Sequence, residues 1–223
     1  MTQDATTVAR SQAKTIETNS LIRNTYMLLS MTLLFSAVTA GISMALSLPH
    51  PGLIITLAGY FGLLFLTNML RNSAWGLASI FALTGFMGLT LGPIISAYLT
   101  AFSNGHELVM MAMGGTGAIF IGLSVYALST RKDFSFLGGF LFAGILVAFL
   151  AGIGAAVFGI PALQLAVSAM FVLLMSGLIL YQTSQMALGG ETNYIMATVT
   201  LFVSIYNLFL SLLHLLGIFG GDD

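Results

Sequence analysis

Polar side chains recur at helical spacing within the last apolar segment of this 223-residue chain. Successive gaps of four, three, four and three residues place them on one face of a helix. They are Thr200, Ser204, Asn207, Ser211 and His214. If the segment crosses a membrane, this face must meet protein or water, because polar groups that face lipid stay unsatisfied. Two interpretations stay open: hydrogen bonds within and between helices, or the lining of a water-accessible cavity.

A second polar cluster, Tyr181–Gln185, ends the preceding apolar segment. Gln182 is long enough to hydrogen-bond to Ser204 or Asn207 if the two segments pack as neighbours. Arg71 could reach the same region, or could anchor its segment at the interface beside Trp75. The candidate polar cluster or gate therefore consists of Arg71, Tyr181, Gln182, Ser204, Asn207 and Ser211.

The three histidines, His50, His106 and His214, fall on or near one side of the expected membrane domain. Imidazoles titrate near neutral pH and bind metals, so a joint pH sensor or metal site is conceivable. Scattered interfacial histidines are the commoner arrangement. We therefore predict no metal site and keep His214, on the polar face, as a candidate pH-sensing residue.

The chain lacks the groups that most intramembrane chemistry requires. It has no cysteine, which excludes thiolate catalysis and disulfides. No apolar segment carries a central Lys, so a retinal Schiff base is excluded. The acidic residues lie in tails or at segment ends, which weakens the case for a proton-relay pump. The Gly114–Gly117 run lacks the GK[ST] signature of a phosphate loop. We predict neither enzyme activity nor a cofactor, and a net charge of −1 offers nothing to nucleic acid.

The elements that position these side chains must be membrane helices. Charged residues make up only 6% of the chain and hydrophobic residues 58%, with a mean hydropathy of +1.02, whereas soluble domains carry about 25% charged residues. The continuous apolar runs exclude a β-barrel. We predict an all-α membrane protein with a seven-transmembrane-helix domain at residues 21–223. Its expected helices, each close to the roughly 20 residues that crossing requires, are Tyr26–Leu48, Gly52–Leu70, Ala74–Thr100, Leu108–Ser129, Phe134–Phe158, Ala162–Ser184 and Tyr194–Gly217.

The basic residues indicate the orientation of these helices. All of them precede the first segment or lie in the second and fourth loops: Arg10, Lys14, Arg23, Arg71, Arg131 and Lys132. The positive-inside rule then places the N-terminus in the cytoplasm and the C-terminus on the opposite side. A six-span version with a re-entrant last segment would bring the C-terminus inside. Residues 1–20 are polar and are expected to form a flexible cytoplasmic tail, which could serve as a handle for an ATP-driven membrane protease.

Small residues at four-residue spacing predict close helix packing. They are Gly144, Ala148, Gly152 and Ala156 in the fifth segment and Gly88 and Gly92 in the third. Packing within one molecule is favoured over a dimer interface. Pro93 is expected to kink or break the third helix.

Three motifs resemble the transmembrane Bax-inhibitor-motif family and appear in that family's order. The run from Thr130 to Gly139, TRKDFSFLGG, is similar to its loop entering the fifth helix. LGPIISAY (Leu91–Tyr98) and LFVSIYNLFLSLL (Leu201–Leu213) are similar to its third and last helices. The resemblance covers nearly the whole chain and implies a central helix surrounded by six others.

The resemblance also implies two possible functions. Some family members conduct a pH-sensitive calcium leak gated by two aspartates on the last two helices. Here the matching positions hold Gln182 and Ser204, which supply no charge for a divalent cation, so a leak of Ca²⁺ or H⁺ is the alternative function. The strongest similarity is to bacterial inner-membrane members that modulate, and are substrates of, an ATP-dependent membrane protease. We therefore expect an inner-membrane regulatory protein whose partners are the lipid bilayer and such a protease.

Overall fold

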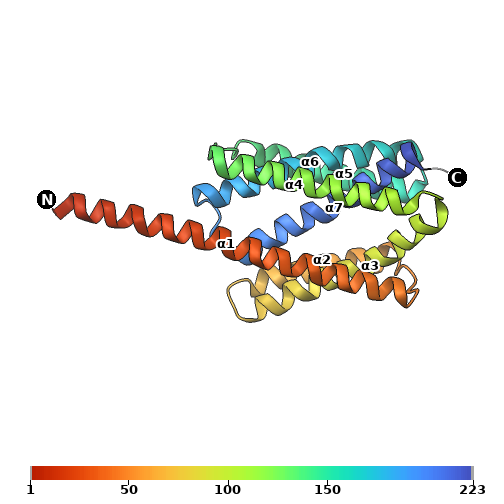
Figure 1. Ribbon diagram of the computed structural model, residues 1–223, viewed down its shortest axis with the longest axis horizontal. Helices are drawn as coiled ribbons and strands as arrows, with labels where there is room; N and C mark the ends of the chain where they lie inside the picture. The colour runs from red at the N-terminus through yellow and green to blue at the C-terminus, as the bar shows by residue number, and fades with distance from the viewer. Residues whose placement is uncertain (1, 222–223) are drawn as a thin grey trace.

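The computed structural model describes the backbone of residues 2–221 and the side chains from Ile16 onward (Figure 1). Met1 and the terminal Asp222 and Asp223, which the sequence places in the two tails, lie outside the described residues. Within residues 2–221 the chain folds into α-helices without strands: α1 (Thr2–Ala45), α2 (Leu53–Leu70), α3 (Trp75–Ala101), α4 (Gly105–Thr130), α5 (Leu137–Phe158), α6 (Pro161–Leu188) and α7 (Tyr194–Gly220). Each is long and apolar enough to cross a membrane. The all-α, seven-helix prediction is confirmed.

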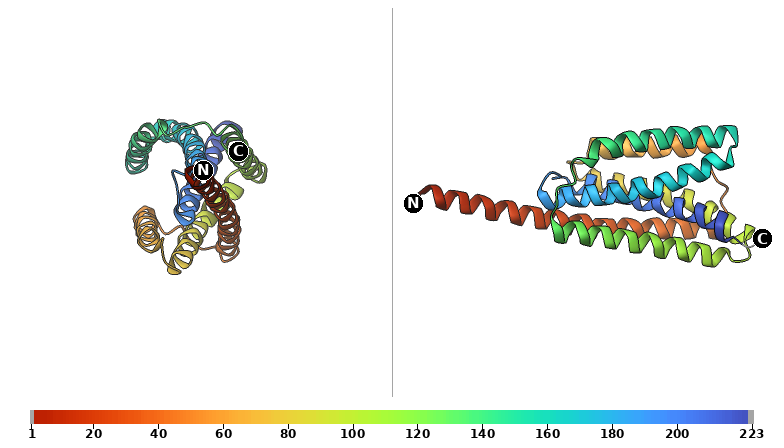
Figure 2. Two further views of the ribbon diagram at one scale, coloured as in Figure 1. Left: turned by 90° about the vertical axis from the view of Figure 1, so that its left-hand side faces the viewer. Right: turned by 90° about the horizontal axis from the view of Figure 1, so that it is seen from above.

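The last helix, α7, is the central one. α1, α3, α4 and α6 pack against it, while α2 packs on α3 and α5 packs on α6. A view along the bundle shows α2 (orange) and α5 (green to teal) at its edge (Figure 2, left). The six other helices thus surround α7 in two layers. α7 is an unbroken helix of 27 residues, about 40 Å long at 1.5 Å per residue, so it is long enough to cross a membrane in full.

The N-terminal segment belongs to a helix from residue 2 onward. α1 runs without interruption from Thr2 to Ala45, and its first part projects from the bundle as a helix (Figures 1 and 2). The physical reason is visible in the sequence, which has no Pro or Gly before Gly41, so nothing breaks a helix that the membrane span propagates outward. The flexibility of this segment and its place in the cytoplasm stay predictions.

Helix ends are set by backbone geometry rather than by polarity. α6 was expected to end at Ser184, where polar residues accumulate, but it continues to Leu188 and ends at Gly189. Gly189 has φ +76, a left-handed conformation that glycine adopts without steric cost. The whole Tyr181–Gln185 cluster is therefore helical. α3 also continues through Pro93.

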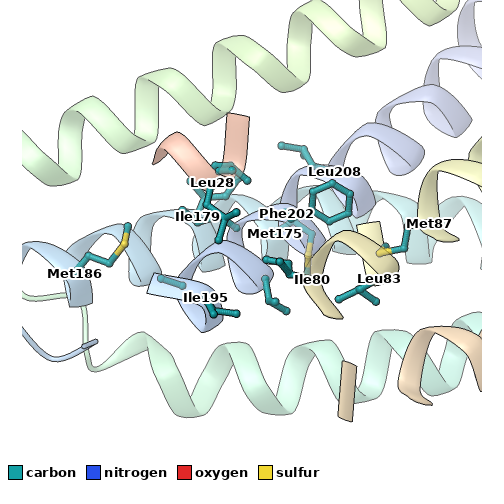
Figure 3. Close-up of a cluster of buried hydrophobic side chains, with 14 of the residues drawn as sticks. Leu28, Ile80, Leu83, Met87, Met175, Ile179, Met186, Ile195, Phe202 and Leu208 are labelled. Carbon is teal, nitrogen blue, oxygen red and sulfur yellow. The ribbon is translucent and has the colours of Figure 1, made fainter. Parts of the chain in front are cut away.

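The main core lies where α1, α3, α6 and α7 meet. Leu28, Ile179 and Phe202 lie close together there, with Ile80 and Leu83 of α3 beside them (Figure 3). All five are 2% exposed or less. This apolar layer fixes α7 against its neighbours and so positions the polar face that α7 carries.

Glycines bring α1 and α3 into close contact, as the small-residue pattern predicts. A Cβ on Gly92 would lie 2.6 Å from Cβ of Ser43 and 2.8 Å from the carbonyl oxygen of Ala40. The Ser43 hydroxyl donates to the Leu89 carbonyl oxygen at 2.9 Å. In α5, Gly144 and Gly152 face α6 side chains, Leu174 and Val167. Both stripes therefore serve contacts within the molecule.

Candidate functional site

Gln182 is buried in α6, with 5% of its surface exposed. Its amide Nε2 has no hydrogen-bond partner among the described residues. The expected bond from Gln182 to Ser204 or Asn207 is therefore not formed through this donor. Tyr181, the preceding residue, lies half-buried with its ring against Gly138 of α5.

The polar face of α7 is satisfied mainly by its own backbone. Thr200 donates to the Met196 carbonyl oxygen at 3.0 Å, and Ser204 to the Thr200 carbonyl oxygen at 2.7 Å. Nδ2 of Asn207 donates to the Val203 carbonyl oxygen at 2.8 Å. Ser204 is fully buried and Ser211 is 7% exposed. Thr200, Ser204 and Asn207 therefore bond within their own helix, a pattern that Ser and Thr commonly adopt.

His214, on the same face of α7, forms a hydrogen bond to a neighbouring helix, α6. Its Nδ1 lies 2.7 Å from the hydroxyl oxygen of Ser168 on α6. Sequence reasoning missed Ser168, although a serine within the apolar run of α6 was the available signal. The three histidines do not assemble, because His50 lies in the α1–α2 loop and His106 in the first turn of α4, and both are exposed. Among the described residues no group of three or more His, Cys, Asp or Glu could hold a metal ion.

Arg71 lies at the exposed end of α2 and donates through Nη1 to Oδ1 of Asn68 at 3.2 Å. This exposed position agrees with an interface anchor. The Arg71 backbone takes part in a loop contact that the sequence did not suggest. Nδ2 of Asn193 donates to the Arg71 carbonyl oxygen at 3.1 Å and to Oδ1 of Asn72 at 2.9 Å. Oδ1 of Asn193 also accepts from the Met196 backbone N–H, which caps α7.

Ser184 makes the corresponding contact with the α4–α5 loop. Its fully buried hydroxyl donates to the Lys132 carbonyl oxygen at 2.7 Å and accepts from the Phe134 backbone N–H at 3.3 Å. Ser184, in the last turns of α6, and Asn193, directly before α7, therefore hold the two basic loops at one end of the bundle.

Asp133 shapes the tip of the α4–α5 loop. Its Oδ1 accepts from the Ser135 backbone N–H at 2.8 Å. This hydrogen bond, with a further contribution from the Ser135 side chain, lowers the pKa of the Asp133 carboxyl below its ordinary value. The loop thus favours an ionised carboxylate at Asp133, which follows the exposed basic residues Arg131 and Lys132 in the sequence and precedes α5.

Two apolar cavities flank α7 at the depth of the spans. One, of about 390 Å³, lies among α1, α3, α4 and α7. The other, of about 430 Å³, lies among α2, α3, α5, α6 and α7, and Asn207 is on its wall. Tyr206 borders both, and its hydroxyl lies 3.2 Å from the Thr90 hydroxyl. Aliphatic and aromatic side chains dominate both linings. Neither cavity therefore has the polar lining expected of a water-accessible cavity along the polar face of α7.

This geometry, with a central last helix and two basic loops fixed at one end, can be compared with known proteins. The family model described as "Inhibitor of apoptosis-promoting Bax1" matches residues 18–221. The chain belongs to the Bax inhibitor family. The match begins within α1 and includes the whole helical bundle, which confirms the resemblance carried by the three motifs.

Similar proteins occur in bacteria and in mammals. The chain is 55% identical to an uncharacterised protein of Pseudomonas aeruginosa, over 93% of each chain. It is 52% identical to "Modulator of FtsH protease YccA" of Escherichia coli K12, over 93% of this chain and 94% of that one. It is 31% identical to mouse "Protein lifeguard 4", over 88% of this chain and 84% of the mouse protein. The likeness to YccA therefore extends over nearly the entire Bax inhibitor domain and into α1.

Proposed function

We propose that this Bax inhibitor family member is a regulatory protein of the bacterial inner membrane that binds an ATP-dependent protease of the FtsH type. It modulates the degradation of other membrane proteins and is itself a substrate of the protease. The observation that carries the proposal is the 52% identity to the FtsH modulator YccA over 93% of this chain. The E. coli O6:H1 relative bears the name "Inner membrane protein YccA".

The projecting part of α1 supports a route by which a protease engages the chain. It extends beyond the bundle with no neighbouring helix beside it (Figure 1). The distribution of Lys and Arg supports a cytoplasmic position for this end, where the ATPase part of such a protease would meet it. The segment is also polar, since residues 2–20 contain Asp4, Arg10, Lys14 and Glu17.

The cation-leak alternative has weaker support. Ser204 is committed to its own helix and the exposed surface of Gln182 is small. Neither side chain carries charge, and oxygen ligands with negative charge are what Ca²⁺ requires. The cavity beside Asn207 is apolar, which disfavours a hydrated cation.

The proposal is tested by altering the projecting segment and measuring protease association and substrate turnover in cells. Deletion of residues 2–15 is expected to reduce co-purification with the protease and to lengthen the half-life of the chain itself. The matched control replaces residues 2–15 with a Gly/Ser sequence of equal length, which separates the need for a handle from the need for this sequence. Unchanged association and unchanged turnover in the deletion variant would contradict the role of α1.

A further inference from the structure

Among the described residues, five of the six buried side-chain polar atoms without a hydrogen-bond partner belong to α1, α4 and α6. They are the hydroxyl oxygens of Thr25 and Tyr26 in α1, the hydroxyl oxygen of Ser124 in α4, and the Thr183 hydroxyl oxygen and Gln182 Nε2 in α6; the sixth, the Thr56 hydroxyl oxygen, lies apart in α2. None has a hydrogen-bond partner among the residues that the structure describes. Thr25 and Thr183 are fully buried, and Ser124 and Gln182 are 4% and 5% exposed.

These side chains share one level of the bundle, near the end expected in the cytoplasm. Gln182 and Thr183 precede the last residue of α6 by six and five residues, and Ser124 precedes the last residue of α4 by six, which is about 8–9 Å at 1.5 Å per residue. Both α1 and α4 pack against α6.

Contacts of α1 place Thr25 and Tyr26 at the same level. The Thr198 hydroxyl, one turn into α7, donates to the Thr25 carbonyl oxygen at 3.3 Å. The Tyr26 ring has its centroid 6.0 Å from that of Phe120, one turn from Ser124 on α4. The five side chains therefore lie at a similar depth on three helices, of which α6 packs against both α1 and α4; we refer to them as the polar layer.

Unpaired polar side chains in such a layer are unfavourable. Buried hydroxyl and amide groups are almost always hydrogen-bonded to protein or to ordered water, and the low dielectric around membrane helices raises the cost of leaving them unpaired. Each hydroxyl can donate and accept, and the Gln182 amide has two donor hydrogens. The layer contains no charged side chain, so its chemistry fits a neutral ligand rather than a metal ion.

A cavity lined mainly by polar residues, here called the polar cavity, lies at the same end of the bundle. It has a volume of about 440 Å³ and is lined by α1 and the α6–α7 connection, including Asn24, Tyr194 and Thr192. Asn24 is adjacent to Thr25, and the Tyr194 carbonyl oxygen accepts from the Thr198 hydroxyl at 2.7 Å. Solvent in this cavity therefore reaches the residue next to Thr25.

We propose that Thr25, Tyr26, Ser124, Gln182 and Thr183 form a binding site for a cluster of buried water molecules between α1, α4 and α6. Water is small enough to enter from the polar cavity and can match both donors and acceptors, as buried waters typically do with about three hydrogen bonds each. At the end where α1 enters the bundle, the water molecules then bridge α1 to α4 and α6. Farther along, α1 contacts α3 directly at Gly92. The site is independent of any protease partner.

Radiolytic hydroxyl labelling tests the site, because radicals generated from bound water modify the side chains beside it. The full chain is reconstituted in lipid nanodiscs, exposed to an X-ray pulse and analysed by mass spectrometry. Tyr26 is expected to be labelled several-fold faster than Tyr206. Tyr206 is the matched control, since it is also half-buried but bonds to Thr90 and borders the apolar cavities.

A substitution separates a hydrated layer from a dry one. Under the proposal, Thr183→Val removes a water ligand, slows Tyr26 labelling and lowers Tm by about 2–4 °C. Thr32→Val is the control, because Thr32 is fully buried and its hydroxyl already donates to carbonyl oxygens of its own helix, Leu28 and Leu29, so it should leave Tyr26 labelling unchanged. Labelling of Tyr26 no faster than Tyr206, together with a higher Tm for Thr183→Val, would overturn the proposal.

Discussion

Two short polar side chains, Ser184 and Asn193, join the helices α6 and α7 to distant loops. The residues that sequence reasoning singled out, Ser204 and Asn207, bond within α7, whereas Ser184 and Asn193 reach across to loops far away in the chain. Asn193 gave a partial signal, since an Asn directly before an apolar run is a typical helix N-cap. Its bond to the α2–α3 loop and the bonds of Ser184 depend on tertiary neighbours, which a single sequence does not reveal.

Replacing Ser184 with Ala should destabilise the protein by about 1–3 kcal/mol, because the Phe134 N–H and the Lys132 carbonyl lose a buried partner. Thermal unfolding of the purified protein in detergent measures the effect. Ser30→Ala is the control, since the exposed Ser30 hydroxyl bonds only to its own helix at Tyr26. Equal stabilities of the two variants would show that the Ser184 contact contributes nothing.

The loop carboxyl of Asp133 should make a small, pH-dependent contribution to stability. Its pKa is lowered in the folded protein, so the unfolded chain takes up the proton first as pH falls. The stabilisation is therefore present above the ordinary value of 3.8 and disappears as pH falls through the folded pKa.

Comparing the Tm of wild type and Asp133→Ala across pH measures this contribution. The difference should be positive near neutrality and vanish in strong acid. Asp133→Asn keeps a side-chain acceptor without titrating, so its Tm difference from Asp133→Ala should not change through the same range. A difference between wild type and Asp133→Ala that persists in acid would assign the effect to something other than the carboxylate.

At the scale of helices, the sequence identified every span of the described residues but misplaced several ends. Apolar length alone locates a membrane helix, which is why the seven segments were found. It does not locate the last turn, so α6 extends past Ser184 to Gly189 and the N-terminal segment continues α1 outward. In both cases the helix follows backbone propensity, and the change from apolar to polar residues does not end it.

The glycine contact between α1 and α3 gives a test at this scale. Gly92→Ala should destabilise the protein by about 1–3 kcal/mol, because its Cβ would overlap Ser43 and the Ala40 carbonyl oxygen. Gly114→Ala in α4 is the control: a Cβ there meets nothing within 4 Å, and the change should be neutral or stabilise by up to about 1 kcal/mol. Thermal unfolding measures both. Similar Tm values for the two variants would contradict the tight α1–α3 contact.

For the whole molecule, the arrangement around α7 follows from the family, whereas the orientation rests on charge. Hydropathy predicted how many helices to expect, but nothing in the sequence alone indicated that α2 and α5 form an outer layer. That layering depends on which faces complement each other in three dimensions, as Gly144 and Leu174 do between α5 and α6.

The absence of cysteine from the sequence makes the orientation directly measurable. A single cysteine introduced by Lys132→Cys should react with a membrane-impermeant maleimide only after cells are permeabilised. His106→Cys, on the opposite end, should react once the inner membrane is reached from the outside. The reverse pattern would place the basic loops and the projecting end of α1 outside the cytoplasm.

The central claim concerns the partner, and one measurement tests it most directly. The tagged full-length chain is crosslinked in native membranes, purified and analysed by quantitative mass spectrometry beside an unrelated multi-pass protein expressed at the same level. The account predicts that a membrane-anchored ATP-dependent protease is enriched with this chain and that the enrichment falls when residues 2–15 are deleted. Recovery of no such protease above the control would contradict the account.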